Sequence, residues 1–116
     1  MGALPGYQSL IDMMRAVSGW DLTLEELLKT GERINNQRQA FNIREGLNSL
    51  KYNMPGRIVG KPPKTAGPSA GMSVDEETLD QGYLTAMGWD TATTKPGKKK
   101  LLELGLDDVA KELWPE

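Results

Sequence analysis

The stretch from Gly19 to Gly46 constrains the fold more than any other part of this 116-residue chain, because a clear helix start precedes a long apolar stripe. Thr23 is followed three residues later by Glu26. This spacing is typical of a capping box, in which each side chain bonds a backbone N–H that the first helical turn leaves unpaired. Leucines and other apolar residues then recur near the helical period. We therefore predict one long helix over about residues 23–50.

Polar side chains interrupt this apolar stripe at an unusual density. They are Arg33, Asn35, Asn36, Arg38, Asn42 and Arg44. Residues three or four positions apart, such as Arg38 and Asn42, share one face of a helix. These amide and guanidinium groups could line a polar cofactor or bind backbone carbonyls of a neighbouring domain. A solvated helix face is the competing interpretation.

Apolar spacing and capping residues predict four shorter helices, over about residues 5–17, 74–87, 98–104 and 107–113. The first carries apolar residues at the spacing of an amphipathic helix: Tyr7, Leu10, Ile11, Met14 and Val17. Ser73 and Glu76 form a second capping box before the helix over residues 74–87. We expect that helix to end at Gly88.

Residues 53–72 break this helical pattern, because proline and glycine alternate throughout the segment. Neither a helix nor an inner strand tolerates that punctuation, so we predict an irregular loop. The sequence Gly-Trp-Asp occurs at residues 19–21 and again at 88–90, and we interpret it as two helix ends where a Trp folds back on the bundle. The predicted fold is all-α: a small helical bundle of about four or five helices with a long Pro/Gly-rich loop, in a single domain over residues 1–116.

The composition excludes several classes of function. The chain has no Cys and no His, so it lacks disulfides, catalytic thiols, imidazole bases and the usual ligands of zinc or iron–sulfur clusters. A net charge of −2 argues against binding nucleic acid, which needs clustered Lys and Arg. No apolar run approaches the roughly 20 residues that span a bilayer, and no signal-peptide pattern is present. We expect a cytoplasmic protein with no membrane or nucleic-acid partner.

Two charged clusters need an interpretation. Four carboxylates lie close together in the sequence: Asp75, Glu76, Glu77 and Asp80. Oxygen ligands of this kind suit a hard cation, but their place at a helix N-terminus favours stabilisation of the helix dipole. Seven basic residues could form a surface for an acidic protein, with a plain solvated surface as the alternative: Lys95, Lys98, Lys99, Lys100, Arg57, Lys61 and Lys64.

Several separated blocks of the sequence agree with one known family. Residues 19–36, with Arg38, Ala40-Phe41-Asn42 and Arg44-Glu45-Gly46, closely resemble the C-terminal region of tungsten-containing aldehyde ferredoxin oxidoreductases. The Pro-rich loop, Gly67-Pro68-Ser69-Ala70-Gly71, the acidic helix, the second Gly-Trp-Asp and the Leu-rich segment at 99–106 follow in the family's order. The resemblance spans essentially the whole chain.

The resemblance implies a role within a larger enzyme. Family members are several times longer and hold a tungsten or molybdenum bis-pterin beside a 4Fe-4S cluster ligated by four cysteines. This chain has none of those cysteines, so no catalytic, metal or cluster residue is assigned to it. In the family setting, the six polar residues of the long helix become an expected inter-domain surface. The remainder of such a polypeptide is the expected partner, and ferredoxin is the expected partner of the complete enzyme.

Two functions are therefore weighed. The first is the C-terminal helical domain or a fragment of such an oxidoreductase, packing around its cofactor and substrate channel and not catalytic on its own. The complete enzyme would oxidise aldehydes to carboxylic acids with ferredoxin as acceptor. The alternative is a free-standing, non-catalytic interaction module derived from the family. Exposed apolar surface also predicts a possible homo-oligomer.

Overall fold

The computed structural model describes residues 5–115, and this part of the chain is helical with two isolated β-bridges. The α-helices are α1 (Pro5–Ser18), α2 (Leu24–Arg44), α3 (Gly56–Val59), α4 (Glu76–Met87), α5 (Lys98–Glu103) and α6 (Asp107–Leu113). A 3₁₀ turn, η1, covers Ser49–Lys51. The predicted all-α class is confirmed. The first residues of the chain and Glu116 lie outside the described part, so the prediction of one domain over residues 1–116 stays a prediction.

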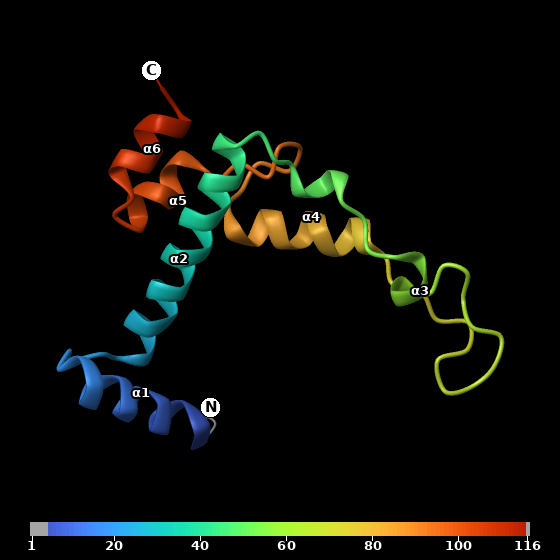
Figure 1. Cartoon of the computed structure of the whole chain (residues 1–116), viewed down its shortest axis with the longest axis horizontal. Helices are drawn as coiled ribbons and strands as arrows, with labels where there is room; N and C mark the ends of the chain where they lie inside the picture. The colour runs from blue at the N-terminus through green and yellow to red at the C-terminus, as the bar shows by residue number, and fades with distance from the viewer. Residues whose placement is uncertain (1–4, 116) are drawn as a thin grey trace.

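The hydrophobic core lies at one end of the molecule, where α5 and α6 pack against the C-terminal half of α2 (Figure 1). Ala40, Leu101, Ala110 and Leu113 form its buried centre. From this core, α2 leads away to α1, and α4 with α3 extends in another direction (Figure 1). The radius of gyration is 18.6 Å, whereas a compact domain of this length has about 13 Å. The helices are therefore spread widely around a small core.

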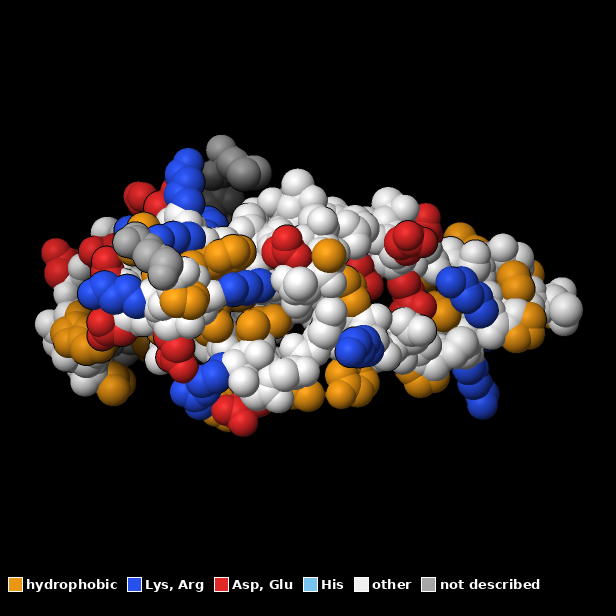
Figure 2. Space-filling view, turned by 90° about the horizontal axis from the view of Figure 1, so that it is seen from above, with side chains coloured by type: hydrophobic (Ala, Val, Ile, Leu, Met, Phe, Trp, Pro, Cys, Tyr) orange, Lys and Arg blue, Asp and Glu red, His pale blue; other side chains and the backbone are white. Residues whose placement is uncertain are grey.

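Much apolar surface stays uncovered in this arrangement. Figure 2 shows hydrophobic side chains at the surface toward both ends of the molecule, between charged groups. Exposed examples occur on α1, α2, α3 and α4: Val17, Phe41, Ile58 and Leu79. Single exposed apolar residues are ordinary in proteins, whereas contiguous exposed apolar patches are typical of interaction sites.

The long helix predicted over residues 23–50 is shorter than expected. The capping box at its start is confirmed, with Thr23 and Glu26 exchanging hydrogen bonds. The helix ends at Arg44, because Gly46 adopts a left-handed φ of 78° that a helix cannot contain. The N–H groups of Gly46 and Leu47 then donate to the carbonyls of Ile43 and Asn42, the pattern of a Schellman motif.

The segment over residues 53–72 is not wholly irregular, as it was predicted to be. Gly56–Val59 forms one helical turn, α3, and Val59 is buried. The Val59 carbonyl accepts a hydrogen bond from the N–H of Val74, and this pairing holds residues 73 and 74 outside α4. The predicted Ser73–Glu76 capping box is therefore wrong. Asp75 is the N-cap instead, and its carboxylate accepts from the N–H and hydroxyl of Thr78.

The remaining helix boundaries agree with the sequence patterns within two residues. Helix α4 ends as predicted at Gly88, which has a φ of 67°. The Gly88–Gly97 segment then returns toward α2, with a bridge between Trp89 and Pro96. It carries a Trp and a Thr against the middle of α2, where most of the predicted polar residues lie.

Candidate functional site

The six polar residues predicted as an inter-domain surface do not form one surface. The structure divides them by burial. Asn36 is fully buried, Arg33 and Asn42 are partly buried, and Asn35, Arg38 and Arg44 are exposed. Their different surroundings follow from the helical period, which turns adjacent residues toward different neighbours.

Asn36 faces the interior and uses both ends of its amide within the chain. Its Nδ2 donates to the carbonyl of Glu32 at 2.8 Å, and its Oδ1 accepts from the indole Nε1 of Trp89 at 2.8 Å. A buried amide needs such partners because an unpaired polar group costs about 1–3 kcal/mol. Asn36 thus joins α2 to the segment after α4 and does not present its side chain to another domain.

Gln39 extends this polar contact by one helical turn, and the sequence patterns did not identify it. Its Nε2 donates to both the carbonyl oxygen and the hydroxyl of Thr94, at 3.0 and 2.7 Å. Thr94 is fully buried and has a left-handed φ of 62°. We name Asn36, Gln39, Trp89 and Thr94 the α2 polar cluster. The signal that could have found it is the spacing of three between the two amides of α2, which places them on one face.

The partly buried members and Arg44 also have partners within the chain. Arg33 donates through Nε to the carbonyl of Leu104 at 2.8 Å. Asn42 donates to the Oε1 of Gln39 at 3.5 Å. Arg44 lies over the ring of Phe41, 5.1 Å from its centroid, and pairs with Glu112 and Glu45. These residues connect α2 to its neighbours in the chain.

Asn35 and Arg38 differ from the other four. Both side chains are exposed, and neither has a hydrogen bond or ion pair within residues 5–115. Of the six predicted positions, these two combine exposure with unpaired polar groups in the described structure. They are three residues apart and therefore share a face of α2.

The two Gly-Trp-Asp sequences follow helix ends as predicted, but only one Trp folds back. Trp89 packs edge-on against Tyr83, with ring centroids 5.8 Å apart, and donates to Asn36. Trp20 is 66% exposed, because α1 points away from the core and leaves no surface for its ring. The prediction is wrong for Trp20.

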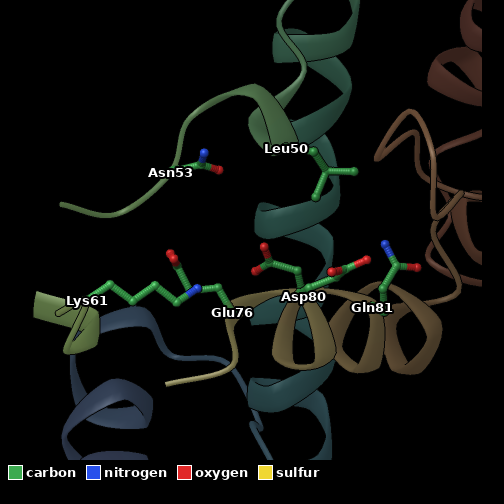
Figure 3. Close-up of a pocket in the computed structure, with 7 residues that line it drawn as sticks. Leu50, Asn53, Lys61, Glu76, Asp80 and Gln81 are labelled. Atoms are coloured by element: carbon green, nitrogen blue, oxygen red, sulfur yellow. The ribbon is translucent and has the colours of Figure 1, made fainter. Parts of the chain in front are cut away.

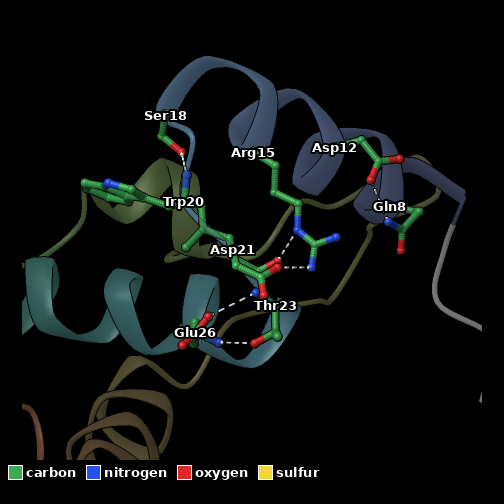
Figure 4. Close-up of polar contacts among 9 residues, drawn as sticks. Gln8, Asp12, Arg15, Ser18, Trp20, Asp21, Thr23 and Glu26 are labelled. Carbon is green, nitrogen blue, oxygen red and sulfur yellow. Dashed lines mark hydrogen bonds and ion pairs between the residues drawn. The ribbon is translucent and has the colours of Figure 1, made fainter.

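The turn after α1 is instead an ordered polar elbow (Figure 4). Arg15 donates through Nε to the carbonyl of Leu22 at 2.7 Å and pairs with Asp21 at 3.2 Å. The Ser18 hydroxyl accepts from the N–H of Trp20 at 3.1 Å. We name this segment, residues 15–26, the α1–α2 elbow. Its hydrogen bonds, together with the capping box, hold α1 at a defined angle to α2.

The acidic residues of α4 border an open hollow of about 380 Å³ between η1 and α4. Figure 3 shows Lys61 extending toward Glu76 along this hollow, with Asp80 and Gln81 on the α4 side. Glu76 accepts a hydrogen bond from the N–H of Met54 at 3.1 Å. The hydrogen bonds from Thr78, aided by the charge of Lys61, hold the pKa of Asp75 below its usual value. These contacts support the capping interpretation of the acidic cluster.

The seven basic residues fall into two separate regions. Lys95 and Lys98–Lys100 lie at the core end, whereas Arg57, Lys61 and Lys64 lie around α3 at the opposite end (Figure 1). Lys100 pairs with Glu32 at 3.3 Å, and the Lys95 ammonium lies 3.7 Å from the centroid of the Trp114 ring. The structure therefore does not bring these residues together as one basic surface.

The described residues do not fit the metal centre of the resembled family. Within residues 5–115, no group of three or more Asp, Glu, His or Cys side chains is arranged to hold a metal ion. The chain contains no Cys, so it offers no thiolate to an iron–sulfur cluster. Separately, none of the helices in the described part is long and apolar enough to cross a membrane.

Comparison with known proteins shows which family the chain is similar to. The family described as "Aldehyde ferredoxin oxidoreductase, domains 2 & 3" matches residues 3–106. A tungsten-containing aldehyde ferredoxin oxidoreductase of Pyrococcus abyssi is 38% identical over 98 residues, covering 84% of this chain and 16% of that protein. The Pyrococcus horikoshii protein of the same name is 36% identical over 104 residues, covering 89% and 17%. The Pyrococcus furiosus one is 38% identical over 96 residues, covering 82% and 16%.

The chain belongs to the aldehyde ferredoxin oxidoreductase family and corresponds to part of its helical domains 2 and 3. It spans about a sixth of the length of these curated relatives. No solved structure matches it significantly. The family match includes the α2 polar cluster, the α1–α2 elbow and the acidic helix α4.

Proposed function

We propose that this chain acts as a C-terminal helical domain of an aldehyde ferredoxin oxidoreductase-like enzyme and packs around the cofactor and substrate channel of a larger polypeptide. One observation carries the proposal: a family match over residues 3–106 falls on a chain whose helices are spread around a small core. A segment that folds within a larger protein normally contributes surface to an interface that is absent when it stands alone.

In the complete enzyme, an aldehyde would be oxidised to a carboxylic acid, with ferredoxin as the electron acceptor. A tungsten or molybdenum bis-pterin and a 4Fe-4S cluster would supply the redox chemistry, held by residues outside this chain. The chain's own contribution is structural, since it has no Cys and no group of carboxylates arranged for a metal within residues 5–115. We place the assembly in the cytoplasm.

Asn35 and Arg38 are the polar contacts that we assign to the larger polypeptide. Both are exposed, and both lack side-chain partners in the described structure. A guanidinium has five N–H donors and suits backbone carbonyls or carboxylates of a neighbouring domain. The α2 polar cluster has a different role, because its hydrogen bonds hold α2 against the returning Gly88–Gly97 segment within the chain.

Affinity purification of the tagged chain from its source cell, with metal analysis of the complex, tests this proposal. We expect a larger, Cys-containing polypeptide of the same family to co-purify with tungsten or molybdenum and iron, and the complex to oxidise aldehydes with ferredoxin. The purified chain alone should carry none of these metals in stoichiometric amount. A chain that binds metal by itself would contradict the proposal, and a stable chain without any such polypeptide would favour the free-standing interaction module.

A matched pair of substitutions tests the assignment of Arg38. Arg38→Glu should weaken the complex at least tenfold, because it reverses a charge at the contact. Arg57→Glu is the control, since Arg57 is also exposed but lies on α3, away from this face of α2. Equal effects of both substitutions would show that net charge, and not the α2 contact, determines association.

A further inference from the structure

Gly31 lies in the interior of α2, on a side of the helix that the rest of the described chain leaves open. Glycine weakens a helix interior relative to alanine, because it loses more backbone entropy when the helix forms. The φ of Gly31 is not among the positive values that only glycine adopts easily. A Cβ built at Gly31 would meet no atom within 4 Å beyond its own helix backbone and chain neighbours. Within residues 5–115, nothing in the structure therefore requires a glycine at this position.

The side chains around Gly31 leave a gap in the outer surface of α2. The neighbours of a helical residue are those three and four positions away, here Leu27, Leu28, Ile34 and Asn35. Both rows of side chains that cross a helix surface pass through Gly31, and both are interrupted there. Leu28 is 59% exposed and Ile34 52% exposed, so apolar groups border the gap.

Unpaired polar groups lie on the same side of the helix. Asn35 and Arg38 follow Gly31 by four and seven residues, which places all three on one face. The buried Ala40 is nine residues from Gly31, or two and a half turns, so the core lies on the opposite side. We name Gly31, Ile34, Asn35 and Arg38 the α2 outer face. Its single charge is the guanidinium of Arg38, and it holds no carboxylate.

We propose that a segment of the larger family polypeptide crosses α2 at the α2 outer face, with its backbone against Gly31 and a carboxylate bonded to Arg38. This inference rests on the proposed function and names the contact through which the chain joins the assembly. Glycine lets another backbone approach more closely than any other residue does. Packed helices lie about 8–10 Å apart, depending on the side chains between them, so a glycine at the crossing favours the lower limit.

Charge favours this occupant over a second copy of the chain. Two copies of the α2 outer face would bring two unpaired Arg38 side chains into one interface with no carboxylate between them, which like-charge repulsion opposes. An acidic segment instead forms a charge-assisted and commonly bidentate hydrogen bond with the guanidinium. The chain spans about a sixth of the length of its curated relatives, so most of a family polypeptide that could supply such a segment lies outside it.

Substitutions at Gly31, with Gly82 as a matched control, separate this contact from a local effect on the helix. Gly82 is likewise exposed in the interior of α4, and a Cβ there would also meet no atom within 4 Å. Gly31→Ala, Gly31→Leu and Gly82→Leu should each raise the urea midpoint of the isolated chain by about 0.5 M, because alanine and leucine are better helix formers. A raised midpoint also shows that each variant is folded.

Binding to the larger family polypeptide is the decisive measurement. That polypeptide is isolated from the source cell with the tagged unmodified chain, immobilised, and titrated with each variant by biolayer interferometry. Gly31→Leu should raise the dissociation constant roughly tenfold or more, because its side chain holds the two backbones apart, and Gly31→Ala should raise it by a smaller factor. Gly82→Leu should leave it unchanged within about twofold. Arg38→Gln should reduce its dependence on salt, because the ion pair is lost.

Four results would overturn the inference. Unchanged binding of the stabilised Gly31→Leu variant would show that Gly31 is only a tolerated weak point of α2, and the proposed function would still stand. Equal weakening by Gly82→Leu would place the effect outside the α2 outer face. Self-association of the isolated chain that Gly31→Leu abolishes in sedimentation would show that a second copy covers this face. An unmodified chain that captures no larger family polypeptide would overturn the proposed function as well.

Discussion

Replacing Asn36 by leucine and Trp89 by phenylalanine, singly and together, tests whether their hydrogen bond determines how α4 is held against α2. Asn36 is fully buried, and its Oδ1 lies 2.8 Å from the Trp89 indole nitrogen. Leucine keeps the branched shape of asparagine, with bulkier methyl groups, but removes both the acceptor for Trp89 and the donor to the Glu32 carbonyl. Phenylalanine keeps an aromatic ring beside Tyr83 but removes the donor. Each single substitution therefore leaves at least one polar group without its partner.

The expected magnitudes follow from that geometry. An unsatisfied buried donor or acceptor costs about 1–3 kcal/mol, so each single variant should lose about 2 kcal/mol of unfolding free energy. The double variant removes both groups, and it should lose about 1–2 kcal/mol less than the sum of the single losses. With a urea m-value of about 2 kcal/mol per molar, each single substitution lowers the midpoint by about 1 M.

Urea unfolding followed by circular dichroism at 222 nm measures these differences without relying on Trp fluorescence, which Trp89→Phe changes. Asn36→Asp is a useful additional variant, because it retains an acceptor for Trp89 while losing the donor to the Glu32 carbonyl. The reasoning would be refuted if the two single losses of unfolding free energy summed to the loss of the double variant within about 0.5 kcal/mol, because independent sites are additive in that way. Unchanged m-values are required for the comparison.

Three further predictions concern the backbone, the acid range and the elbow. Gly97→Ala should lower the unfolding free energy, measured by urea, by about 1–3 kcal/mol, because a Cβ there would collide with a backbone carbonyl oxygen. Gly31→Ala should raise it by about 1 kcal/mol, because the space at its Cβ position is open. A loss of stability in both variants would contradict this. Hydrogen bonds from Thr93 and Ala92 lower the pKa of Asp90 in the folded state, so its contribution to stability is present above the ordinary Asp pKa and is lost as pH falls through the lowered value. Asp90→Asn should therefore be less stable at pH 7 and less sensitive to acid, as thermal melts from pH 7 to pH 2 would show. An equal fall of melting temperature with pH in the variant and the unmodified chain would count against this prediction. Asp21→Asn should change the unfolding free energy by less than about 0.5 kcal/mol, because its carboxylate is 98% exposed. Arg15→Met should lower the unfolding free energy by about 1 kcal/mol, because it removes the hydrogen bond to the Leu22 carbonyl. Equal effects of the two substitutions in urea unfolding would contradict this prediction.

The family, the all-α class and most helix boundaries could be predicted from the sequence because they depend on local signals. The capping box at Thr23 and Glu26 and the helix stop at Gly88 are set by residues only a few positions apart. The end of α2 was missed, although its signal is also local, because the apolar spacing continues past Gly46 and masked the Schellman motif there. The Ser73 cap failed for a different reason, since the bond between Val74 and Val59 spans a long loop.

The candidate site was only partly predictable for the same physical reason. Spacing placed Asn36 and Arg38 on one helix but could not tell which of them faces inward. Which residue faces inward depends on where Trp89 and Thr94 pack against α2, and both are more than 50 residues away in the chain. Gln39 was overlooked because a single Gln on a helix is usually solvated, and only the buried hydroxyl of Thr94 distinguishes it.

The sequence by itself determined where helices begin, that the chain has no thiolate or imidazole ligand, and to which family it belongs. The tertiary structure decided which polar groups are bonded inside the chain and which are exposed to solvent. Local hydrogen bonds and helical periodicity depend on neighbours in sequence, whereas burial depends on distant segments that meet in space. For this reason Asn36 and Trp89 bond to each other inside the chain, while Arg38 is exposed and has no hydrogen bond or ion pair in the described part.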